Sequence, residues 1–398
     1  MVLRGPRIWG HDGPADVLIR DGIVAEVGGT FDTSDCEVVD LSGQLLIPSL
    51  VEAHCHLDKT LYGGPWVPHS AGDTLADRIA NDRDRRRELG IPDIDRIVAL
   101  LERMSSFGTT HVRTHTDVDP DVGLLGIEVV EAAAERLGDR MVVQQVAFPQ
   151  HGIVTNPGTE ELLADAATAG VRAIGGIDPA GMDRDPVRHL DVVFGLAERF
   201  GLDLDIHLHD GGTLGAWELE LIADRTAALS MGGRVAVSHA YAFGDLNDHQ
   251  QDLLVDRLAH AGVAIVTGAV YSFPVPPVKK LRAAGVTVAC GHDGIRDLWG
   301  PYGSGDMLER AMHLAYRSTF RSDPDIELAL EAATIGGRRL LGLDPRGVEV
   351  GAPADLVAID AGTAAEAVVT HPDHRTVIRA GRALPQRPID VTGVGDDA

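Results

Sequence analysis

Histidine and aspartate residues gather in four short segments of the sequence, each directly after an apolar run. The first segment holds His54 and His56, and the others hold His207, His239 and Asp293. In an extended segment residues i and i+2 point to one side, so both imidazoles of the first segment can reach one ion. Imidazole nitrogens and carboxylate oxygens are common ligands of divalent metals. The spacing therefore indicates a metal site built from several strand ends.

Such a site has the groups needed to activate water. A divalent cation held by neutral imidazoles lowers the pKa of bound water to about 7, so hydroxide attacks without a protein nucleophile. We expect Asp293 to bind the metal and to accept the proton of the water, while His239 stabilises the attacking oxygen. Asp210, three residues beyond His207, is the expected proton shuttle to the leaving group, with a merely structural carboxylate as the alternative.

Other residues near these segments have competing interpretations. His292 is expected to be a core histidine, because its neighbour Asp293 should face the site. His209 shares a strand face with His207 and is expected to face solvent or to support a ligand. Lys59 follows the first segment, and it either contacts the substrate or pairs with a nearby acid as part of the scaffold.

The elements that must position these residues are visible as an alternation. Apolar, β-branched runs alternate with amphipathic stretches of helical length, such as residues 93–106 and 124–137, which predicts repeated βα units around a parallel sheet. The predicted strands cover residues 45–51, 110–114, 141–148, 171–177, 202–207, 234–238, 263–267 and 286–290. We interpret this as an α/β protein with a (β/α)8 TIM-type barrel, whose functional residues lie at the carboxyl ends of the strands.

The two ends of the chain predict small β structure. Asp21-Gly22 lies between the apolar runs 17–20 and 23–27, which is a signal for a two-residue hairpin. Further β-prone runs cover residues 354–359 and 376–380. Because each end is too short to fold alone, we expect residues 1–44 and 346–398 to form one small β-sandwich beside a barrel of residues 45–345.

Composition excludes several classes of partner. The 398 residues include 35 Lys+Arg and 60 Asp+Glu, a net charge of −25, which argues against nucleic acid as a partner. The 3 cysteines are too few for a disulfide framework, so a cytoplasmic location is expected. No apolar run approaches the roughly 18 residues of a spanning helix, so no membrane association is expected.

The chain resembles the amidohydrolase superfamily, and most closely its cytosine deaminase branch. The resemblance is carried by residues 47–58, by His111-Val112-Arg113-Thr114-His115, by residues 146–150 and by Gly291-His292-Asp293 with Trp299 beyond. It covers almost the whole chain. It implies that the terminal β segments are the sandwich that these enzymes carry, and, by analogy, that the chain forms a homo-oligomer.

The same resemblance implies roles for individual residues. One Zn(II) or Fe(II) ion would be bound by His54, His56, His207 and Asp293. His239 would orient or deprotonate the metal-bound water, and Gln150 would hold the ring edge of the substrate. Lys59 and Trp299 are further candidates for substrate contact, Trp299 by stacking on a flat ring, although a core position is equally open. The implied activity is release of ammonia from a cyclic amidine, such as a pyrimidine, triazine or pterin.

Two residues depart from the pattern of the branch. Asp210 stands where these deaminases usually have a glutamate, which is one methylene longer. Gly294 stands where cytosine deaminases have a second acid facing the substrate, so we expect more room and one charge fewer. The segment 268–280 is also shorter than in cytosine deaminases. These differences favour a larger or differently substituted ring over cytosine.

Three alternatives remain beside deamination. Release of an alkylamine from a substituted triazine or pyrimidine would use the same residues. Opening of a cyclic amide commonly uses two metals bridged by a modified lysine after the fourth strand, and no lysine lies near Ile177-Asp178. A non-catalytic relative that binds a metal or ligand is the third. The His-x-Glu and Pro-Cys-x-x-Cys segments of the other zinc deaminases do not occur in this chain.

Overall fold

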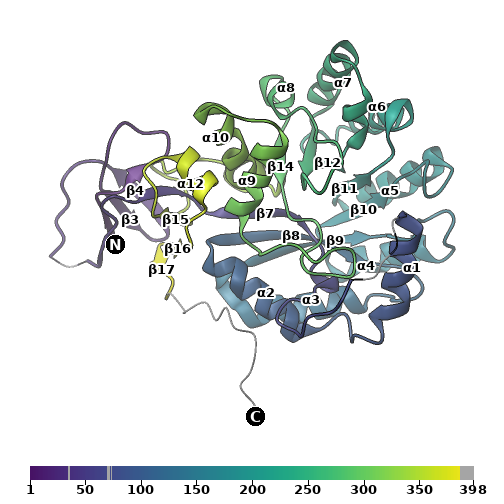
Figure 1. The fold of residues 1–398 in the computed structure, drawn as a ribbon, viewed down its shortest axis with the longest axis horizontal. Coiled ribbons are helices and arrows are strands. Elements are labelled where there is room, and N and C mark those ends of the chain that lie inside the picture. The colour runs from purple at the N-terminus through teal and green to yellow at the C-terminus, as the bar shows by residue number, and fades with distance from the viewer. Residues whose placement is uncertain (35, 70–71, 73, 386–398) are drawn as a thin grey trace.

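The computed structural model describes residues 1–34, 36–69, 72 and 74–385, and its largest part is a barrel (Figure 1). Parallel strands pair in chain order: β7 (Leu50–Cys55), β8 (Thr109–Asp117), β9 (Val142–Phe148), β10 (Ala173–Ile177), β11 (Asp203–Leu208), β12 (Val235–His239), β13 (Val263–Thr267) and β14 (Val288–Cys290). A parallel bridge between Cys55 and Asp293 joins the first and last strands at their carboxyl ends. The predicted (β/α)8 barrel is thereby confirmed.

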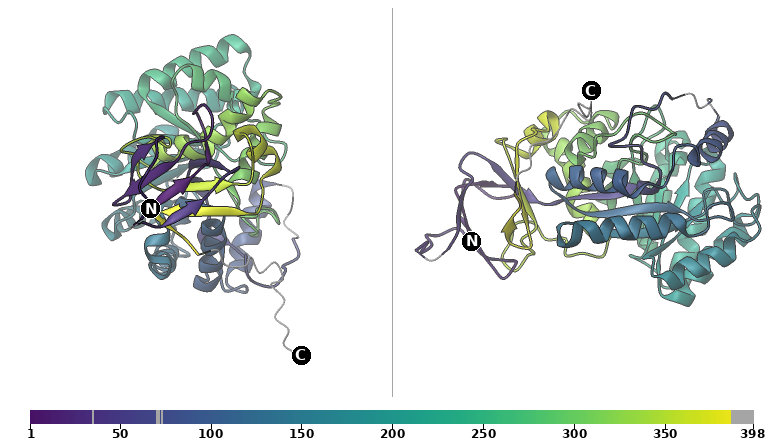
Figure 2. Two further views of the ribbon diagram at one scale, coloured as in Figure 1. Left: turned by 90° about the vertical axis from the view of Figure 1, so that its left-hand side faces the viewer. Right: turned by 90° about the horizontal axis from the view of Figure 1, so that it is seen from below.

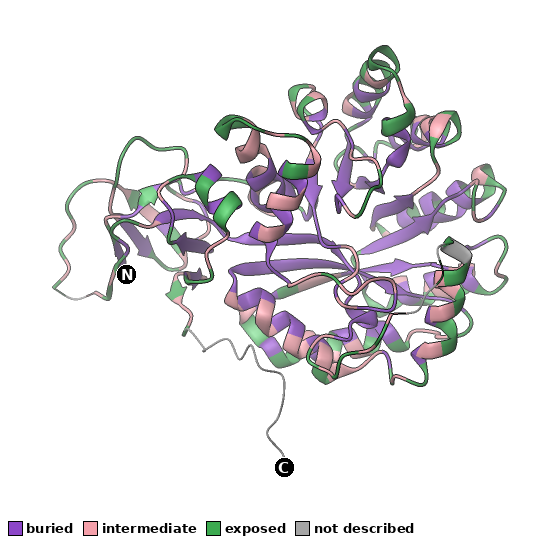
Figure 3. Ribbon diagram, viewed as in Figure 1, coloured by how far each residue is buried: buried purple, intermediate pink, exposed green. Residues whose placement is uncertain are grey.

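Helices cover the outside of this sheet. They are α2 (Ile94–Ser106), α3 (Leu125–Leu137), α4 (Thr159–Ala169), α5 (Pro186–Phe200), α6 (Gly212–Ala228), α7 (Asp248–Ala261), α8 (Val278–Ala283), α9 (Met307–Arg317) and α10 (Asp323–Glu331). An additional helix, α1 (Leu75–Arg86), lies in the connection between β7 and β8. Figure 3 shows the barrel strands buried and the exposed residues on the outer faces of the helices. None of the described helices is long and apolar enough to cross a membrane.

Strands from residues 2–48 and 356–383 form a pair of small sheets beside the barrel (Figure 2). One sheet has the order β4 (Ile23–Val27), β3 (Val17–Arg20), β1 (Val2–Arg4) and β5 (Val38–Asp40). The other has the order β17 (Arg382–Ala383), β16 (Arg375–Arg379), β15 (Leu356–Ile359), β6 (Leu45–Pro48) and β2 (Arg7–Ile8). Their inner side chains form a separate apolar core that includes Leu3, Ile19, Leu46 and Ile378.

The strand expected over residues 45–51 is divided between two sheets. Residues 45–48 form β6, which pairs with β15 and β2, and the chain enters the barrel only with β7. Residues 45–48 therefore lie in the small domain and not in the barrel, which corrects that boundary. Both strands are buried, so one continuous apolar run gives no sign of the change of sheet. The expected sandwich segment 386–398 lies outside the described residues.

Buried arginines join the small domain to the barrel. Arg375 on β16 pairs with Asp306, which caps the N-terminus of α9, at 2.5 Å. Arg338 donates to the hydroxyl of Ser49 at 2.8 Å and to the main-chain carbonyl of Asp355 at 3.1 Å. Since α9 follows β14 and lines the site described below, the small domain fixes one wall of that site.

Candidate active site

The four residues expected to bind a metal lie together at one end of the barrel. His54 and His56 come from the end of β7, His207 from β11, and Asp293 from the turn after β14. One ligand atom of each lies within 4.8 Å of the others. Asp293 Oδ1 is 3.6 Å from Nε2 of His54 and 3.3 Å from Nε2 of His56. The group is compact enough for a single ion.

Several ring nitrogens of this group have no hydrogen-bond partner and are therefore available to bind a metal ion. Among the described residues, Nε2 of His54 and both ring nitrogens of His207 have no hydrogen-bond partner although they are buried. The Nδ1 of His56 lies 3.0 Å from the main-chain carbonyl of His115, which leaves its Nε2 as a free lone pair. Burial lowers the pKa of His56, and lowers that of His207 well below its ordinary value. Neutral imidazoles beside a carboxylate fit a divalent metal ion.

His239 and Asp293 are held in an unusual backbone conformation. Their φ angles are +73° and +66°, in the left-handed region that non-glycine residues rarely adopt. Such strain persists only where the surroundings enforce it. The ring of His239 lies 5.1 Å from that of His54 and 5.0 Å from that of His207, centroid to centroid, and its nitrogens have no hydrogen-bond partner among the described residues. His239 thus places an imidazole without hydrogen-bond partners beside the potential metal ligands.

Three of the potential metal ligands, His56, His207 and Asp293, line a cavity of about 880 Å³. Apolar and aromatic side chains form much of its wall, among them Phe148, Ile177, Val270, Tyr271 and Phe273. The ring of Phe148 stacks on His207, with centroids 4.1 Å apart. The volume lies within the range of about 300–1,000 Å³ that is usual for ligand pockets. The cavity can therefore enclose a flat ring that carries apolar substituents.

The structure places His209, and not Asp210, in the wall of this cavity. The Asp210 carboxylate accepts a hydrogen bond from the main-chain N–H of Gly181 at 2.7 Å and shares another with Glu218. Because β11 ends at Leu208, the alternation of side-chain directions stops before residue 210. The geometry therefore does not support Asp210 as the group that faces the substrate.

His209 has the environment of a proton carrier. Its Nδ1 lies 2.8 Å from Asp178 Oδ2, and the main-chain N–H of His209 donates to Oδ1 of the same carboxylate at 2.5 Å. Burial alone would lower the pKa of His209, but the adjacent Asp178 carboxylate outweighs burial and raises that pKa. Sequence reasoning gave Asp178 no role, although it follows β10 as the ligands follow their strands. The Nε2 of His209 is left for exchange of a proton.

A buried polar network connects the expected substrate contacts. Lys59 Nζ lies 2.9 Å from Asp117 Oδ1 and also donates to the side-chain oxygen of Gln150. Gln150 Nε2 and Trp299 Nε1 both donate to Asp82 Oδ2, at 3.3 Å each. The ion pair with Asp117 agrees with the scaffold interpretation of Lys59. Lys59 also lines the cavity, and its contact with the substrate stays a prediction. Asp82 was not anticipated, since α1, which carries it, is not one of the repeated barrel helices.

The expectation that Gly294 leaves free space is wrong. A Cβ atom at Gly294 would lie 2.3 Å from Oδ2 of Asp297, so the carboxyl group of Asp297 already fills this position. Its Oδ1 accepts hydrogen bonds from the main-chain N–H groups of Trp299 and Gly300. Burial raises the pKa of Asp297 to about 7. The cavity is therefore lined by an acid after all. This acid is Asp297, three residues after Gly294, and it lies in an irregular loop that no sequence pattern predicts.

Comparison with known proteins agrees with this geometry. A family model described as the amidohydrolase family matches residues 93–385. N-isopropylammelide isopropyl amidohydrolase of Pseudomonas sp. (strain ADP) is 30% identical over 393 residues, which cover 96% of each chain.

Solved structures extend the similarity to the whole fold. N-isopropylammelide isopropylaminohydrolase from Burkholderia multivorans ATCC 17616 superposes with a TM-score of 0.92 at 46% identity, covering 96% of this chain and 97% of the other. 5-Methylcytosine deaminase from Klebsiella pneumoniae superposes with a TM-score of 0.85 at 28% identity, covering 98% of each chain. The resemblance to the cytosine deaminase branch is thereby confirmed.

Proposed function

The chain belongs to the amidohydrolase family, and from this premise we propose that it releases an alkylamine from an N-alkylated ammelide. Ammelides are hydroxylated aminotriazines, so the proposed substrate is a flat, polar ring with one apolar substituent. The observation that carries the proposal is the cavity of about 880 Å³, which is lined by three of the four potential metal ligands, His56, His207 and Asp293, and by several aromatic side chains. The similarity to two enzymes named for N-isopropylammelide supports the choice of ring.

We assign one divalent ion, Zn(II) or Fe(II), to His54, His56, His207 and Asp293. When bound, the ion would lower the pKa of a coordinated water to about 7 and so supply the nucleophile at neutral pH. Nε2 of His54, which has no hydrogen-bond partner among the described residues, fits this role. So do Nε2 of His56, whose Nδ1 faces a main-chain carbonyl, and the adjacent carboxylate of Asp293.

Two residues would act on the attacking water: Asp293 would accept its proton, and His239 would form a hydrogen bond to its oxygen. A carboxylate oxygen of Asp293 accepts the proton as the new C–O bond forms on the ring carbon. The electron pair of the ring C=N bond moves to the ring nitrogen and re-forms that bond when the amine leaves. His239, whose two ring nitrogens have no partner among the described residues, would donate a hydrogen bond to the attacking oxygen and orient it. No protein nucleophile is needed, because water supplies the oxygen.

The departing amine needs a proton before the C–N bond breaks. His209 Nε2 is assigned to deliver it, since Asp178 holds the opposite nitrogen and favours the protonated ring. This assignment replaces Asp210, which lies against Gly181. The ring edge would be held by Gln150, whose amide retains one N–H and one lone pair after its bonds to Asp82 and Lys59. Trp299 and Lys59 complete the wall at this side.

A second candidate is release of ammonia from an unsubstituted cyclic amidine. The similarity to 5-methylcytosine deaminase and, at 25% identity, to a pterin deaminase favours it. The same residues would carry out both reactions, because only the group on the leaving nitrogen differs. The two candidates therefore make different predictions only about the substrate.

The test is a panel of substrates incubated with the protein loaded with Zn(II) or Fe(II). The panel contains N-isopropylammelide, N-ethylammelide, ammelide, 5-methylcytosine and pterin, and free amine and ammonia are both quantified. Fastest release of alkylamine from the N-alkylated ammelides is expected, and Asp293→Ala should abolish it. Turnover of 5-methylcytosine or pterin alone would select the second candidate. No turnover of any compound by protein with metal bound would reject both.

A further inference from the structure

His54 differs from the neighbouring ligand His56 in what supports its second nitrogen. The Nδ1 of His56 meets a main-chain carbonyl, whereas Nδ1 of His54 lies 2.8 Å from the hydroxyl of Ser238. That hydroxyl lies 2.8 Å from Oδ1 of Asp205. All three side chains of this second arrangement are buried, and Ser238 and Asp205 are fully so. Ser238 and Asp205 thus form a hydrogen-bonded chain on the Nδ1 side of His54, opposite the nitrogen that faces the metal site.

The donors and acceptors in this chain can be assigned one after another. A carboxylate oxygen only accepts hydrogen bonds, so the single hydroxyl proton of Ser238 is donated to Asp205. The hydroxyl oxygen must then accept from Nδ1–H of His54. The imidazole is therefore held as the tautomer with its proton on Nδ1, and the lone pair of Nε2 points to the metal site, where that atom has no hydrogen-bond partner among the described residues.

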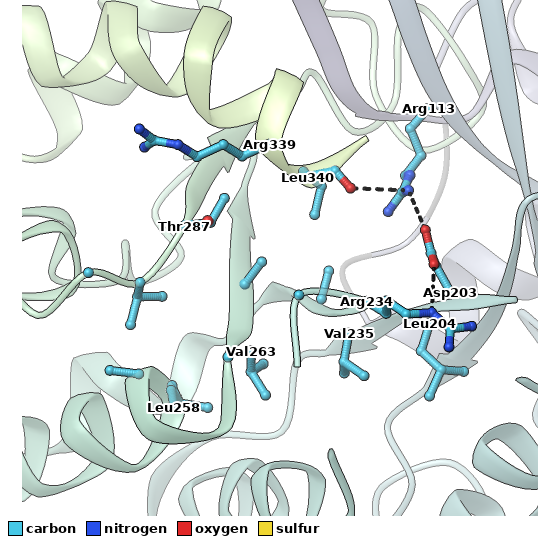
Figure 4. Close-up of a pocket in the computed structure, with 17 residues that line it drawn as sticks. Arg113, Asp203, Leu204, Arg234, Val235, Leu258, Val263, Thr287, Arg339 and Leu340 are labelled. Carbon is cyan, nitrogen blue, oxygen red and sulfur yellow. Dashed lines mark hydrogen bonds and ion pairs between the residues drawn. The ribbon is translucent and has the colours of Figure 1, made fainter. Parts of the chain in front are cut away.

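Asp205 is itself held by an arginine that crosses the barrel interior. Arg113 on β8 places one guanidinium nitrogen 3.3 Å from Asp205 Oδ2 and another 3.4 Å from the carbonyl oxygen of Leu340. Arg113 also lines a cavity of about 170 Å³ at the amino ends of β11 to β14, on the side away from the metal site (Figure 4). In Figure 4 the guanidinium points toward Asp203, which lies 3.6 Å away. Arg113 thus contacts Asp205 and two further groups, Asp203 and the carbonyl of Leu340.

We propose that Asp205 and Ser238 are positioning residues for the metal, acting through His54. They hold its tautomer and ring orientation, and the buried carboxylate makes Nε2 a stronger donor to the ion. Partners of this kind behind a ligating histidine typically raise metal affinity about 10- to 100-fold. The inference rests on the proposed function in one respect, because it takes the group of His54, His56, His207 and Asp293 as the metal site.

A rival explanation uses the same carboxylate as a ligand. His115 is buried, its two ring nitrogens have no hydrogen-bond partner among the described residues, and its Nε2 lies 3.8 Å from Asp205 Oδ2. Together with His54, these residues offer three ligand atoms within 4.8 Å of one another. In that arrangement Asp205 would bind a second ion. The number of ions bound per chain separates the two explanations.

The experiment measures Zn(II) affinity and stoichiometry for the full chain, by competition with a chromophoric chelator. Asp205→Asn and Ser238→Ala are the test variants, and Ser238→Thr restores the hydroxyl. Asp203→Asn is the matched control, since Asp203 is two residues away on β11, is also buried and also faces Arg113, but does not touch Ser238. Ser49→Ala, which removes another fully buried hydroxyl, controls for loss of packing.

We expect one Zn(II) per chain, bound about 10- to 100-fold more weakly by Asp205→Asn and Ser238→Ala and normally by Ser238→Thr. The controls should stay within about twofold of the parent protein, which would separate affinity from general loss of stability. Equal affinity in the test and control variants overturns the proposal, as does a second Zn(II) that disappears in Asp205→Asn. If Asp205→Asn does not fold, the serine variants decide. A parent protein that binds no Zn(II) or Fe(II) would instead reject the proposed function.

Discussion

The rings of His209 and His239 are stacked, with centroids 4.4 Å and planes 26° apart. Their surroundings push the two pKa values in opposite directions. Burial, together with the neighbouring His209, lowers the pKa of His239 well below its ordinary value. For His209 the Asp178 carboxylate outweighs burial and raises the pKa. Two adjacent imidazoles thus favour different protonation states, which is how a site separates acid and base roles.

The first prediction concerns which residue carries the proton to the leaving amine. His209→Gln should lower kcat about 10²- to 10⁴-fold, because it removes the acid, while Asp210→Asn should stay within about threefold of the parent. Asparagine at 210 can still accept the hydrogen bond from Gly181 that the carboxylate accepts now. Steady-state kinetics with metal content measured in parallel checks this. A large loss in Asp210→Asn with metal retained would restore Asp210 as the shuttle.

The second prediction concerns the pH dependence set by Asp178. If protonated His209 is the acid, kcat/KM falls as pH rises through its pKa, which lies above the ordinary value of 6.5. In Asp178→Asn the raising interaction is lost and the lowering effect of burial remains. The alkaline limb should therefore move to lower pH by about one unit or more, each unit being about 1.4 kcal/mol.

A matched control for this variant is available elsewhere in the barrel. Asp183 pairs with Nδ1 of buried His189 at 2.6 Å, in the same manner as Asp178 with His209, but neither residue lines the cavity. Asp183→Asn should lower stability and leave the pH profile in place. A shift of equal size in both variants would show that the pH effect is not specific to His209.

The third prediction concerns removal of the metal. Dialysis against a chelator should abolish turnover, and one equivalent of Zn(II) or Fe(II) per chain should restore it. An ion at 100 times its Kd stabilises the folded state by about 2.7 kcal/mol, so the metal-free protein should also unfold at a lower temperature. His207→Ala should show neither restoration nor thermal stabilisation. Full activity in protein verified to be free of metal would contradict the assignment.

The fourth prediction concerns the buried acid Asp297. Its pKa is about 7 in the folded protein against an ordinary value of 3.8, so the unfolded chain ionises first as pH rises. Stability due to this group is highest below pH 4 and is lost progressively up to about pH 7. The difference of 3.2 units between 3.8 and about 7 corresponds to at most about 4 kcal/mol.

Asp297→Asn removes the loss of stability that comes from ionising a buried carboxyl group. The asparagine keeps an oxygen that can accept hydrogen bonds from the N–H groups of Trp299 and Gly300. Compared with the parent, the variant should gain free energy of unfolding between pH 4 and pH 8, by up to about 4 kcal/mol. Urea unfolding of the metal-free protein across this range measures the gain. A stability difference that does not change with pH would show that Asp297 is already ionised in the folded state.

Strand positions followed from the sequence because the barrel strands are buried on both faces. Residues 263–267 are apolar or β-branched throughout, and they form β13 with the predicted bounds. The same property hid the boundary at residue 48, where one apolar run serves two sheets. Sequence patterns report burial and do not report which neighbour provides it.

For the site, the sequence by itself determined which groups stand at the ends of the strands: His54, His56, His207, His239 and Asp293. Parallel strands bring their carboxyl ends to one rim, so these residues meet whatever the details of the loops. Only the tertiary structure decided that His209 and not Asp210 lines the cavity, that Asp297 fills the space above Gly294, and that Asp205 and Ser238 form hydrogen bonds behind His54. These contacts depend on where the backbone turns after each strand and on pairing between segments far apart in sequence, and neither leaves a periodic signal in the chain.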